Sequence, residues 1–355
     1  MRINIHTYYY GNNYGALLQS LFFKTYLKKQ FNVQVNFHSY QPKNFLYREE
    51  IKPIIKKNII HSINSIKRFL KFRKWKKKYI QSKPNTQFII DQENSNCLSF
   101  YGSDEIWNFN NPFFGYDPFF FGKKNQGFKC SYAASFGTSA SDEIGNYMFE
   151  EIKLLLKNFK FISVRDKSSH NFLKKNFNID SEIVLDPIFL IDNELELFLE
   201  KKEIINNYNY CLIYGRFFTE KEIAIIINFS KKKNLKIVSV GYYNKWANLN
   251  FVDSNPSDFL NFFNYSDYIF TSMFHGVLFS VKYNKNFLFT NDPYRKNKLD
   301  YFIKLLKIED RLFSNNTNIE DTINYSAINL ELNKQKKLSK EFINKSVKYF
   351  LNNEN

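Results

Sequence analysis

The sequence predicts an α/β protein with two Rossmann-like domains, each built on a mostly parallel sheet. Strand-like runs alternate with helical runs along the chain, which is typical of a parallel sheet covered by helices. The length of 355 residues suits two domains better than one. After Asp192 the composition turns acidic, and a second alternation then begins. We therefore predict an N-terminal domain over residues 1–192 and a C-terminal domain over residues 193–355, with the ligand in a cleft between two facing sheets.

Apolar, β-rich runs mark the strands of the first half. They fall at residues 2–8, 33–37, 88–91, 97–101, 130–134, 161–164 and 183–185. A glycine-containing turn over residues 11–15 precedes an amphipathic helix over residues 16–29. Residues 44–80 form a helical and very basic insert, in which lysines alternate with Phe69, Phe72 and Trp75.

The second half repeats the same alternation. Strands are predicted at residues 210–214, 236–240, 268–271 and 286–290. Helices are predicted at residues 220–232, 257–264 and 277–283, and residues 332–351 form one amphipathic helix at the end of the chain.

The composition and the residue patterns exclude several classes of protein. Hydrophobic residues make up 44%, which excludes disorder along the whole chain. The three cysteines, Cys97, Cys130 and Cys211, have neither a disulfide framework nor metal-like spacing. Since the first residues lack the apolar core of a signal peptide, and no run reaches the roughly 18 apolar residues of a membrane span, we expect a cytoplasmic protein. The histidines are dispersed, and we expect neither an obligatory metal nor a cofactor.

The formal net charge of +17 has three explanations. Nucleic acid is one, but no nucleic-acid-binding motif is apparent, so we do not expect it as a partner. An anionic membrane or substrate is the second, and an AT-biased genome is the third. The basic insert accordingly is either a solvated helix with buried aromatic rings or a peripheral contact with the inner face of an anionic membrane, made by residues such as Lys76, Lys77 and Lys78.

The strongest local motif is the strand, turn and helix start at residues 268–276, which ends on His275 and Gly276. Ligands bind at the carboxyl ends of parallel strands, and the N–H groups of a helix start favour an anion. Gly276 would let a ligand approach the backbone, and His275 would transfer a proton near neutral pH. A histidine at a helix start is also often a cap or a packed ring.

Five further segments lie next to predicted strands. They read GNNYGALLQ at residues 11–19, GSDEIWN at 102–108, SYAASFG at 131–137, SVRDKS at 163–168 and VLDP at 184–187. Together with the His-Gly turn, and in this order, they resemble the polysaccharide pyruvyl transferase family over roughly residues 8–312. The branch that the chain resembles has GSDQIWN and SFHG at the matching places.

The resemblance implies the fold of the two-domain GT-B glycosyltransferases. It also implies transfer of the enolpyruvyl unit of phosphoenolpyruvate to two hydroxyls of a sugar in a cell-surface polysaccharide precursor, which leaves a pyruvate ketal and phosphate. In the family, the arginine of the SVR segment is associated with the negative charge of the donor and the histidine of the HG turn with catalysis. Arg165 and His275 occupy these places. Many members have an arginine two residues before the histidine, where this chain has Met273.

These arguments predict one site with three parts. Phosphoenolpyruvate carries a carboxylate and a phosphate, which require guanidinium groups and helix N-termini. Either Asp104 or Asp186 would take the proton of the attacking hydroxyl, and Trp107 offers an apolar face to a sugar ring. The predicted catalytic residues are His275 and Asp104. The predicted donor-binding residues are Arg165, Gly276, Ser272 and Arg295, with Arg216 and Arg311 as further cations. The predicted acceptor-binding residues are Asn13, Tyr14, Trp107, Asn108 and Asp186.

Ordinary structural roles compete with some of these assignments, since Asp104 also suits a turn cap and Trp107 a core position. Two other functions stay open. One is a glycosyltransferase that uses a nucleotide-sugar donor in the same cleft, which the missing arginine at Met273 favours. The other is a non-catalytic binding or scaffold protein.

Overall fold

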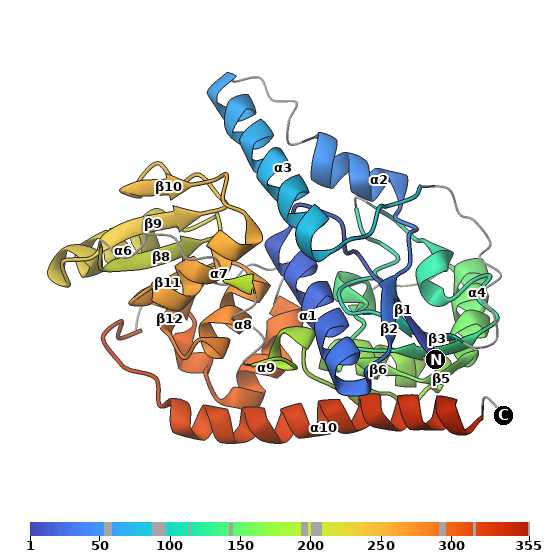
Figure 1. The fold of residues 1–355 in the computed structure, drawn as a ribbon. Coiled ribbons are helices and arrows are strands. Elements are labelled where there is room, and N and C mark those ends of the chain that lie inside the picture. The colour runs from blue at the N-terminus through green and yellow to red at the C-terminus, as the bar shows by residue number, and fades with distance from the viewer. Residues whose placement is uncertain are drawn as a thin grey trace. The chain divides into compact units, whose positions relative to one another are not determined.

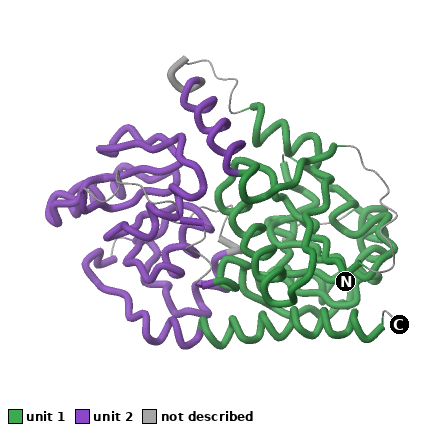
Figure 2. The backbone as a smooth tube through the Cα atoms, in the orientation of Figure 1, with its two compact units in different colours: residues 1–52, 76–191, 332–355 green, residues 53–75, 192–331 purple. Residues whose placement is uncertain are grey.

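The computed structural model describes residues 1–52, 59–86, 97–112, 114–141, 145–192, 198–199, 208–290, 296–314 and 317–353. The chain forms two compact units, which Figure 2 shows in different colours. Unit 1 comprises residues 1–52, 76–191 and 332–355, and unit 2 comprises residues 53–75 and 192–331.

Unit 1 is built on a five-stranded parallel sheet (Figure 1). Its strands are β1 (Arg2–His6), β2 (Gln34–Phe37), β3 (Cys97–Tyr101), β4 (Phe128–Ser131) and β5 (Phe159–Phe161). Their order is β2-β1-β3-β4-β5, and all neighbouring pairs are parallel. A short parallel pair, β6 (Ser163–Val164) with β7 (Glu182–Ile183), joins the same layer through a bridge between Ala134 and Val164.

The helices of unit 1 differ in length and in whether a side chain caps their start. They are α1 (Tyr14–Phe31), α2 (Lys43–Leu46), α4 (Asn146–Lys157), α5 (Lys167–Phe172) and the second part of α10 (Tyr325–Asn352), with shorter turns η1 (Tyr47–Ile51), η2 (Pro118–Phe121), η3 (Gly137–Ser141), η4 (Leu173–Phe177) and η5 (Pro187–Phe189). Asn13 Oδ1 accepts the N–H groups of Gly15 and Ala16 at the start of α1, and Asn32 ends that helix in the left-handed conformation. Most of α1 is buried, which explains why its apolar residues are not confined to one stripe.

Unit 2 has a second five-stranded parallel sheet. Its strands are β8 (Tyr210–Tyr214), β9 (Lys236–Val240), β10 (Leu249–Phe251), β11 (Tyr268–Thr271) and β12 (Asn286–Phe289), in the order β10-β9-β8-β11-β12. The helices are α6 (Glu220–Lys232), α7 (Pro256–Tyr265), α8 (Phe274–Lys282), α9 (Lys296–Leu306) and the first part of α3 (Ile59–Tyr79), with the turn η8 (Glu309–Arg311). Reciprocal capping boxes start α6, with Thr219 and Glu222, and α7, with Asn255 and Asp258.

In both sheets the direction of winding reverses at one point in the strand order. In unit 1 the chain winds outward in both directions from β1 and β3, and in unit 2 from β8 and β11. In open parallel sheets, ligands generally bind at such a point, beyond the carboxyl ends of the strands. The segments after residues 6, 101, 214 and 271 are therefore the places where topology predicts functional side chains.

The predicted α/β class, with a mostly parallel sheet in each half of the chain, is confirmed. The division into residues 1–192 and 193–355 stays a prediction, and the compact units differ from it because residues 53–75 group with unit 2 and residues 332–355 with unit 1. Within the predicted helical insert at residues 44–80, the structure has the helical elements α2, η1 and α3, and residues 53–58 lie outside the described residues. The predicted strand at 88–91 lies outside the described residues.

His6 is a titratable group buried in the core of unit 1. Its ring stacks on Tyr101, with centroids 4.2 Å apart, and on His38, at 4.8 Å. Burial lowers the pKa of His6 well below its usual value of 6.5, and the nearby His38 and Lys129 lower it further. The folded protein therefore keeps this ring neutral at a pH where the unfolded chain protonates it.

Stability should consequently fall as the pH drops below about 6.5, because the unfolded state then binds a proton that the folded state does not. The contribution of His6 is roughly 1.4 kcal/mol per pH unit over that range. Urea unfolding of the wild type and of His6→Gln, compared between about pH 7.5 and pH 5.5, measures it, and the variant should show the flatter dependence. His170→Gln, at a half-buried histidine of α5, is the control. Equal slopes for His6→Gln and the wild type would contradict the assignment.

Candidate functional site

Three charged residues meet at the carboxyl edge of the unit 1 sheet. Asp104 follows β3, Arg165 follows β6, and Asp186 follows β7. Backbone bonds align the three loops: Ser135 N donates to Asp104 O (3.0 Å), Arg165 N to Ala134 O (3.2 Å) and Val184 N to Val164 O (2.9 Å). The sheet thus continues as single bridges beyond its regular strands, and these bridges bring together side chains that lie 61 and 21 residues apart.

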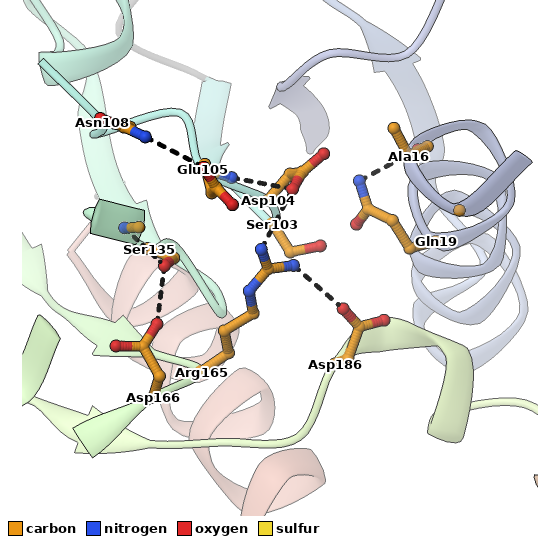
Figure 3. Close-up of polar contacts among 12 residues, drawn as sticks. Ala16, Gln19, Ser103, Asp104, Glu105, Asn108, Ser135, Arg165, Asp166 and Asp186 are labelled. Atoms are coloured by element: carbon orange, nitrogen blue, oxygen red, sulfur yellow. Dashed lines mark hydrogen bonds and ion pairs between the residues drawn. The ribbon is translucent and has the colours of Figure 1, made fainter. Parts of the chain in front are cut away.

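Arg165 bridges the two carboxylates (Figure 3). Its Nη2 donates to Asp104 Oδ1 over 3.1 Å and its Nη1 to Asp186 Oδ2 over 3.3 Å. The Arg165 and Asp186 side chains are each only 3% exposed, whereas that of Asp104 is 19% exposed. A buried guanidinium requires such counter-charges, and here one positive charge faces two negative ones.

Backbone geometry holds both carboxylates in place. Asp104 has a φ of 84°, a left-handed conformation that is uncommon outside glycine, and its Oδ1 also accepts Glu105 N over 2.9 Å. Asp186 caps the turn η5, because its Oδ1 accepts Ile188 N over 3.1 Å. Gly102, just before this segment, has a φ of 120°, and a Cβ there would lie 2.2 Å from Tyr132 O. A side chain at that position would therefore displace the loop that carries Asp104.

A second set of hydrogen bonds supports this edge from the side of β4 and α5. Ser135 Oγ donates to Asp166 Oδ2 (2.6 Å) and accepts Gly137 N (3.0 Å). Asp166 also caps α5 by accepting Ser169 N over 2.7 Å. The Asn108 amide donates to Glu105 Oε2 over 3.0 Å. Ser135, Asp166 and Asn108 thus position the loops that carry the charged cluster.

Three oxygen atoms beside the cluster have no hydrogen-bond partner among the residues that the structure describes. They are Gln19 Oε1, Ser103 Oγ and the second carboxylate oxygen of Asp104, Oδ2. The Gln19 amide orientation is fixed, since its Nε2 donates to Ala16 O over 3.0 Å. In Figure 3 the Gln19 oxygen points away from α1 toward Ser103. Each of these oxygen atoms can accept a hydrogen bond, and the serine can also donate one.

In unit 2 the His-Gly turn lies at the reversal point between β8 and β11. Ser272 Oγ accepts Arg216 N over 3.0 Å, and Thr271 Oγ1 donates to Tyr214 O over 2.6 Å, so the two strand ends are tied together. Met273 precedes α8 as its N-cap residue and makes no side-chain capping bond. His275 is half-buried in the first turn of α8. The first N–H groups of α8 are therefore not satisfied by a cap from the Met273 side chain.

A sequence model of the polysaccharide pyruvyl transferase family matches residues 13–292, which is most of the chain. The protein belongs to this polysaccharide pyruvyl transferase family. No curated protein matches its sequence.

Several solved structures share a distant likeness with this family member. A co-structure of S. aureus MnaA with UDP is 14% identical, with 99% of this chain and 97% of that chain covered and a TM-score of 0.49. A UDP-GlcNAc 2-epimerase from Neisseria meningitidis, bound to UDP-GlcNAc, is 12% identical, with 98% and 94% covered and a TM-score of 0.47. The E. coli heptosyltransferase WaaC with ADP is 7% identical, with 94% and 100% covered and a TM-score of 0.40.

The structure corrects three of the acceptor residues predicted for this polysaccharide pyruvyl transferase family member. Trp107 is fully buried: it packs on Phe121, Phe136 and Phe159, and its Nε1 donates to Phe120 O. It cannot present a face to a sugar. Tyr14 is likewise buried within the first turn of α1.

Asn108 is the third correction. It is 3% exposed, and its amide bonds to Glu105 and Ser139, so it positions a loop instead of meeting a ligand. Asn13, in contrast, is exposed at the start of α1 and stays a prediction.

The structure also shows what surrounds the residues that were predicted to bind the donor. Gly276 is required for packing, since a Cβ there would lie 2.0 Å from Thr271 Oγ1. Arg311 is buried and bonds to Asp310 and Asp321 O, which leaves it a structural role. Arg216 is exposed, with its guanidinium 4.8 Å from the Tyr242 ring centroid. Arg295 lies outside the described residues.

Sequence patterns did not single out Gln19 or Ser103 as site residues, although both belong to segments that carry the family resemblance. A signal was present at Gln19, an amide in the midst of the apolar residues of α1. Within the described parts of the chain, no group of three or more His, Cys, Asp or Glu side chains is placed to hold a metal ion. None of the described helices is long and apolar enough to cross a bilayer.

Substitutions at two fully buried serines, Ser103 and Ser135, test whether the Ser103 hydroxyl serves a ligand or stabilises the fold. Ser103→Ala should leave the free energy of unfolding unchanged or raise it, because its hydroxyl makes no internal bond to a described residue. Ser135→Ala should lower the free energy of unfolding by about 1–3 kcal/mol, because it leaves the buried Asp166 carboxylate and Gly137 N–H without this partner. Urea unfolding of the two variants measures the difference. Equal losses in both would show that Ser103 has a structural role.

Proposed function

We propose that the protein transfers the enolpyruvyl unit of phosphoenolpyruvate to a sugar of a cell-surface polysaccharide precursor and forms a pyruvate ketal. The carrying observation is the Arg165, Asp104 and Asp186 cluster in a member of this family, because it lies at the carboxyl edge of the sheet, where parallel α/β sheets generally bind ligands. In this proposal the first sugar hydroxyl adds to C2 of the enol while a proton goes to C3. The second hydroxyl then displaces phosphate from C2, and the phosphate leaves with the remaining proton.

Asp104 is the better candidate for the base that accepts the proton of the attacking hydroxyl. It is the more exposed of the two carboxylates, and its Oδ2 takes no bond from a described residue, whereas Asp186 is held on one side by Arg165 and on the other by Ile188 N. The Gln19 and Ser103 oxygens add two acceptors nearby. A polyhydroxyl ligand brings O–H donors to acceptors of this kind, which supports the proposal that unit 1 binds the sugar.

The donor needs cations and N–H groups. In unit 2, the first turn of α8 offers N–H groups, and His275 lies in that turn as the proposed proton donor to C3 or partner of the leaving phosphate. Ser272 and Gly276 shape the same turn. Arg165 is the proposed partner of the donor's negative charge. Its guanidinium is occupied by two carboxylates, so a donor anion must compete with Asp104 for Nη2 and would thereby release Asp104 to act as the base.

The alternative is glycosyl transfer from a nucleotide sugar. One observation favours it: the N-cap position of α8 carries Met273, whose side chain supplies neither a charge nor a capping bond for a donor phosphate. Phosphoenolpyruvate, with two anionic groups, depends more on such a cation than a nucleotide sugar does, since the latter also gains from base and ribose contacts. A direct comparison of ligands decides between the two.

Thermal unfolding with phosphoenolpyruvate, phosphate and a panel of nucleotide sugars makes that comparison. At about 100 times its dissociation constant, a bound ligand adds roughly 2.7 kcal/mol of stability. We expect phosphoenolpyruvate to raise the Tm and nucleotide sugars not to. Arg165→Lys should reduce the rise, because lysine keeps one charge but loses the two-pronged geometry. Arg165→Ala is less suitable, since it leaves two carboxylates without their cation and destabilises the fold itself, by about 3–5 kcal/mol.

Phosphate release from phosphoenolpyruvate in the presence of candidate sugars measures turnover. His275→Gln should lower the release by about 10²–10⁴-fold while phosphoenolpyruvate still shifts the Tm, which separates chemistry from binding. His170→Gln is the matched control and should retain wild-type release, because His170 Nδ1 only bonds to Ser181 in unit 1. A Tm shift with a nucleotide sugar alone would overturn the proposal in favour of glycosyl transfer. No shift with any donor, together with unchanged behaviour of His275→Gln, would favour a non-catalytic protein.

A further inference from the structure

The helix α3 presents an apolar stripe to solvent. Ile63, Ile66 and Leu70 are 46%, 42% and 55% exposed, and their spacing of i, i+3 and i+7 places them on one side of the helix. Lys74 and Lys77, at i+11 and i+14, continue the same side and are exposed. We call these five residues the α3 outward face. Large apolar side chains that are exposed in a row, unlike single ones, mark an interaction surface.

Other residues of α3 hold the helix in place. Within unit 2, Arg68 Nη1 donates to Gly241 O over 2.8 Å, Lys71 pairs with Asp253 at 2.6 Å, and Trp75 Nε1 donates to Ser257 Oγ over 2.8 Å. Phe72 and Trp75 are buried. The helix therefore has an inward side that is engaged, and the α3 outward face is not part of the packing that fixes it.

The cations of α3 fall into two groups. Lys71 is paired with Asp253 and Lys76 is buried and paired with Glu50. Lys67, Arg73, Lys74 and Lys77 are exposed and make no ion pair with any residue that the structure describes. The 21 residues of α3 include no acidic side chain. The α3 outward face is thus an apolar stripe surrounded by positive charges without counter-charges.

We propose that the α3 outward face binds the surface of a bilayer that contains anionic phospholipids, with the helix parallel to the membrane plane. Ile63, Ile66 and Leu70 would enter the boundary between headgroups and acyl chains, and Lys67, Lys74 and Lys77 would lie at the lipid phosphates. A second copy of the chain fits this face poorly, because two α3 helices would bring like charges together. Lys76, which the sequence suggested as a membrane contact, is excluded because it is buried within unit 1.

Vesicle sedimentation with purified full-length protein tests the proposal. The wild type should bind vesicles of phosphatidylglycerol and phosphatidylcholine much more strongly than vesicles of phosphatidylcholine alone, and binding should fall when ionic strength rises from about 0.05 to about 0.5 M. Leu70→Ser should weaken binding roughly tenfold, because the variant no longer buries a leucine side chain in the bilayer. Lys74→Glu combined with Lys77→Glu should reduce binding to the level seen with phosphatidylcholine alone.

Leu154→Ser is the matched control. Leu154 is even more exposed, at 62%, but it lies on α4 with Glu150 and Glu151 one turn earlier, so its loss should leave vesicle binding unchanged. Equal loss in Leu154→Ser and Leu70→Ser, or wild-type binding to phosphatidylcholine alone, would overturn the proposal. So would a lack of vesicle binding together with a Leu70-dependent change in oligomeric state, which would assign the face to a second copy. Phosphate release measured without vesicles should be the same in Leu70→Ser and the wild type, so this test is independent of the proposed reaction.

Discussion

The carboxyl edge of unit 1 depends on one requirement, that the buried guanidinium of Arg165 must be neutralised. A charge with 3% exposure is stable only if partners surround it, and here they come from two other loops of the chain. The bond to Asp104 helps to keep that residue in a left-handed conformation, and the bond to Asp186 ties the edge to the turn η5. The Arg165 side chain therefore adds to the backbone bridges that fix the loops after β3, β6 and β7 relative to one another. The same requirement leaves one carboxylate oxygen, Asp104 Oδ2, directed away from the arginine and available to a ligand (Figure 3).

The two units place different chemistry at equivalent topological points. At the reversal beside β3, unit 1 offers hydrogen-bond acceptors. The two carboxylates and one guanidinium of its charged cluster also leave one net negative charge. At the reversal between β8 and β11, unit 2 offers helix N–H groups and a histidine. Acceptors suit the hydroxyls of a sugar, and N–H groups suit an anion. In the proposed reaction, the acceptor oxygens of unit 1 would suit the polyol, and the N–H groups of α8 would add to Arg165 as partners of the anionic donor.

Local patterns predicted the strands well and the side-chain roles less well. The strands at residues 97–101, 210–214, 236–240 and 268–271 match the structure because their apolar, β-branched and aromatic runs are bounded by polar residues, which is a local property. Whether Trp107 meets a sugar or the core depends on Phe121, Phe136 and Phe159, which come from distant segments. The pairing of Arg165 with Asp104 and Asp186 depends equally on bridges across the sheet edge. For Gln19, the sequence shows an amide among apolar neighbours, which is unusual. Only the fold shows what its side-chain oxygen faces.

The lysines of α3 also show that a sequence pattern does not reveal which residues are buried. In the sequence, Lys76 and Lys77 are neighbours in one basic run and are indistinguishable by composition. On a helix, successive residues are about 100° apart, so one lysine of such a run can be buried while the next reaches solvent. Lys76 consequently neutralises Glu50 inside unit 1, whereas Lys77 belongs to the outward stripe with Ile63, Ile66 and Leu70. The physically relevant quantity is therefore the charge on one face of the helix and not the charge of the run, and that face combines unneutralised cations with exposed apolar side chains.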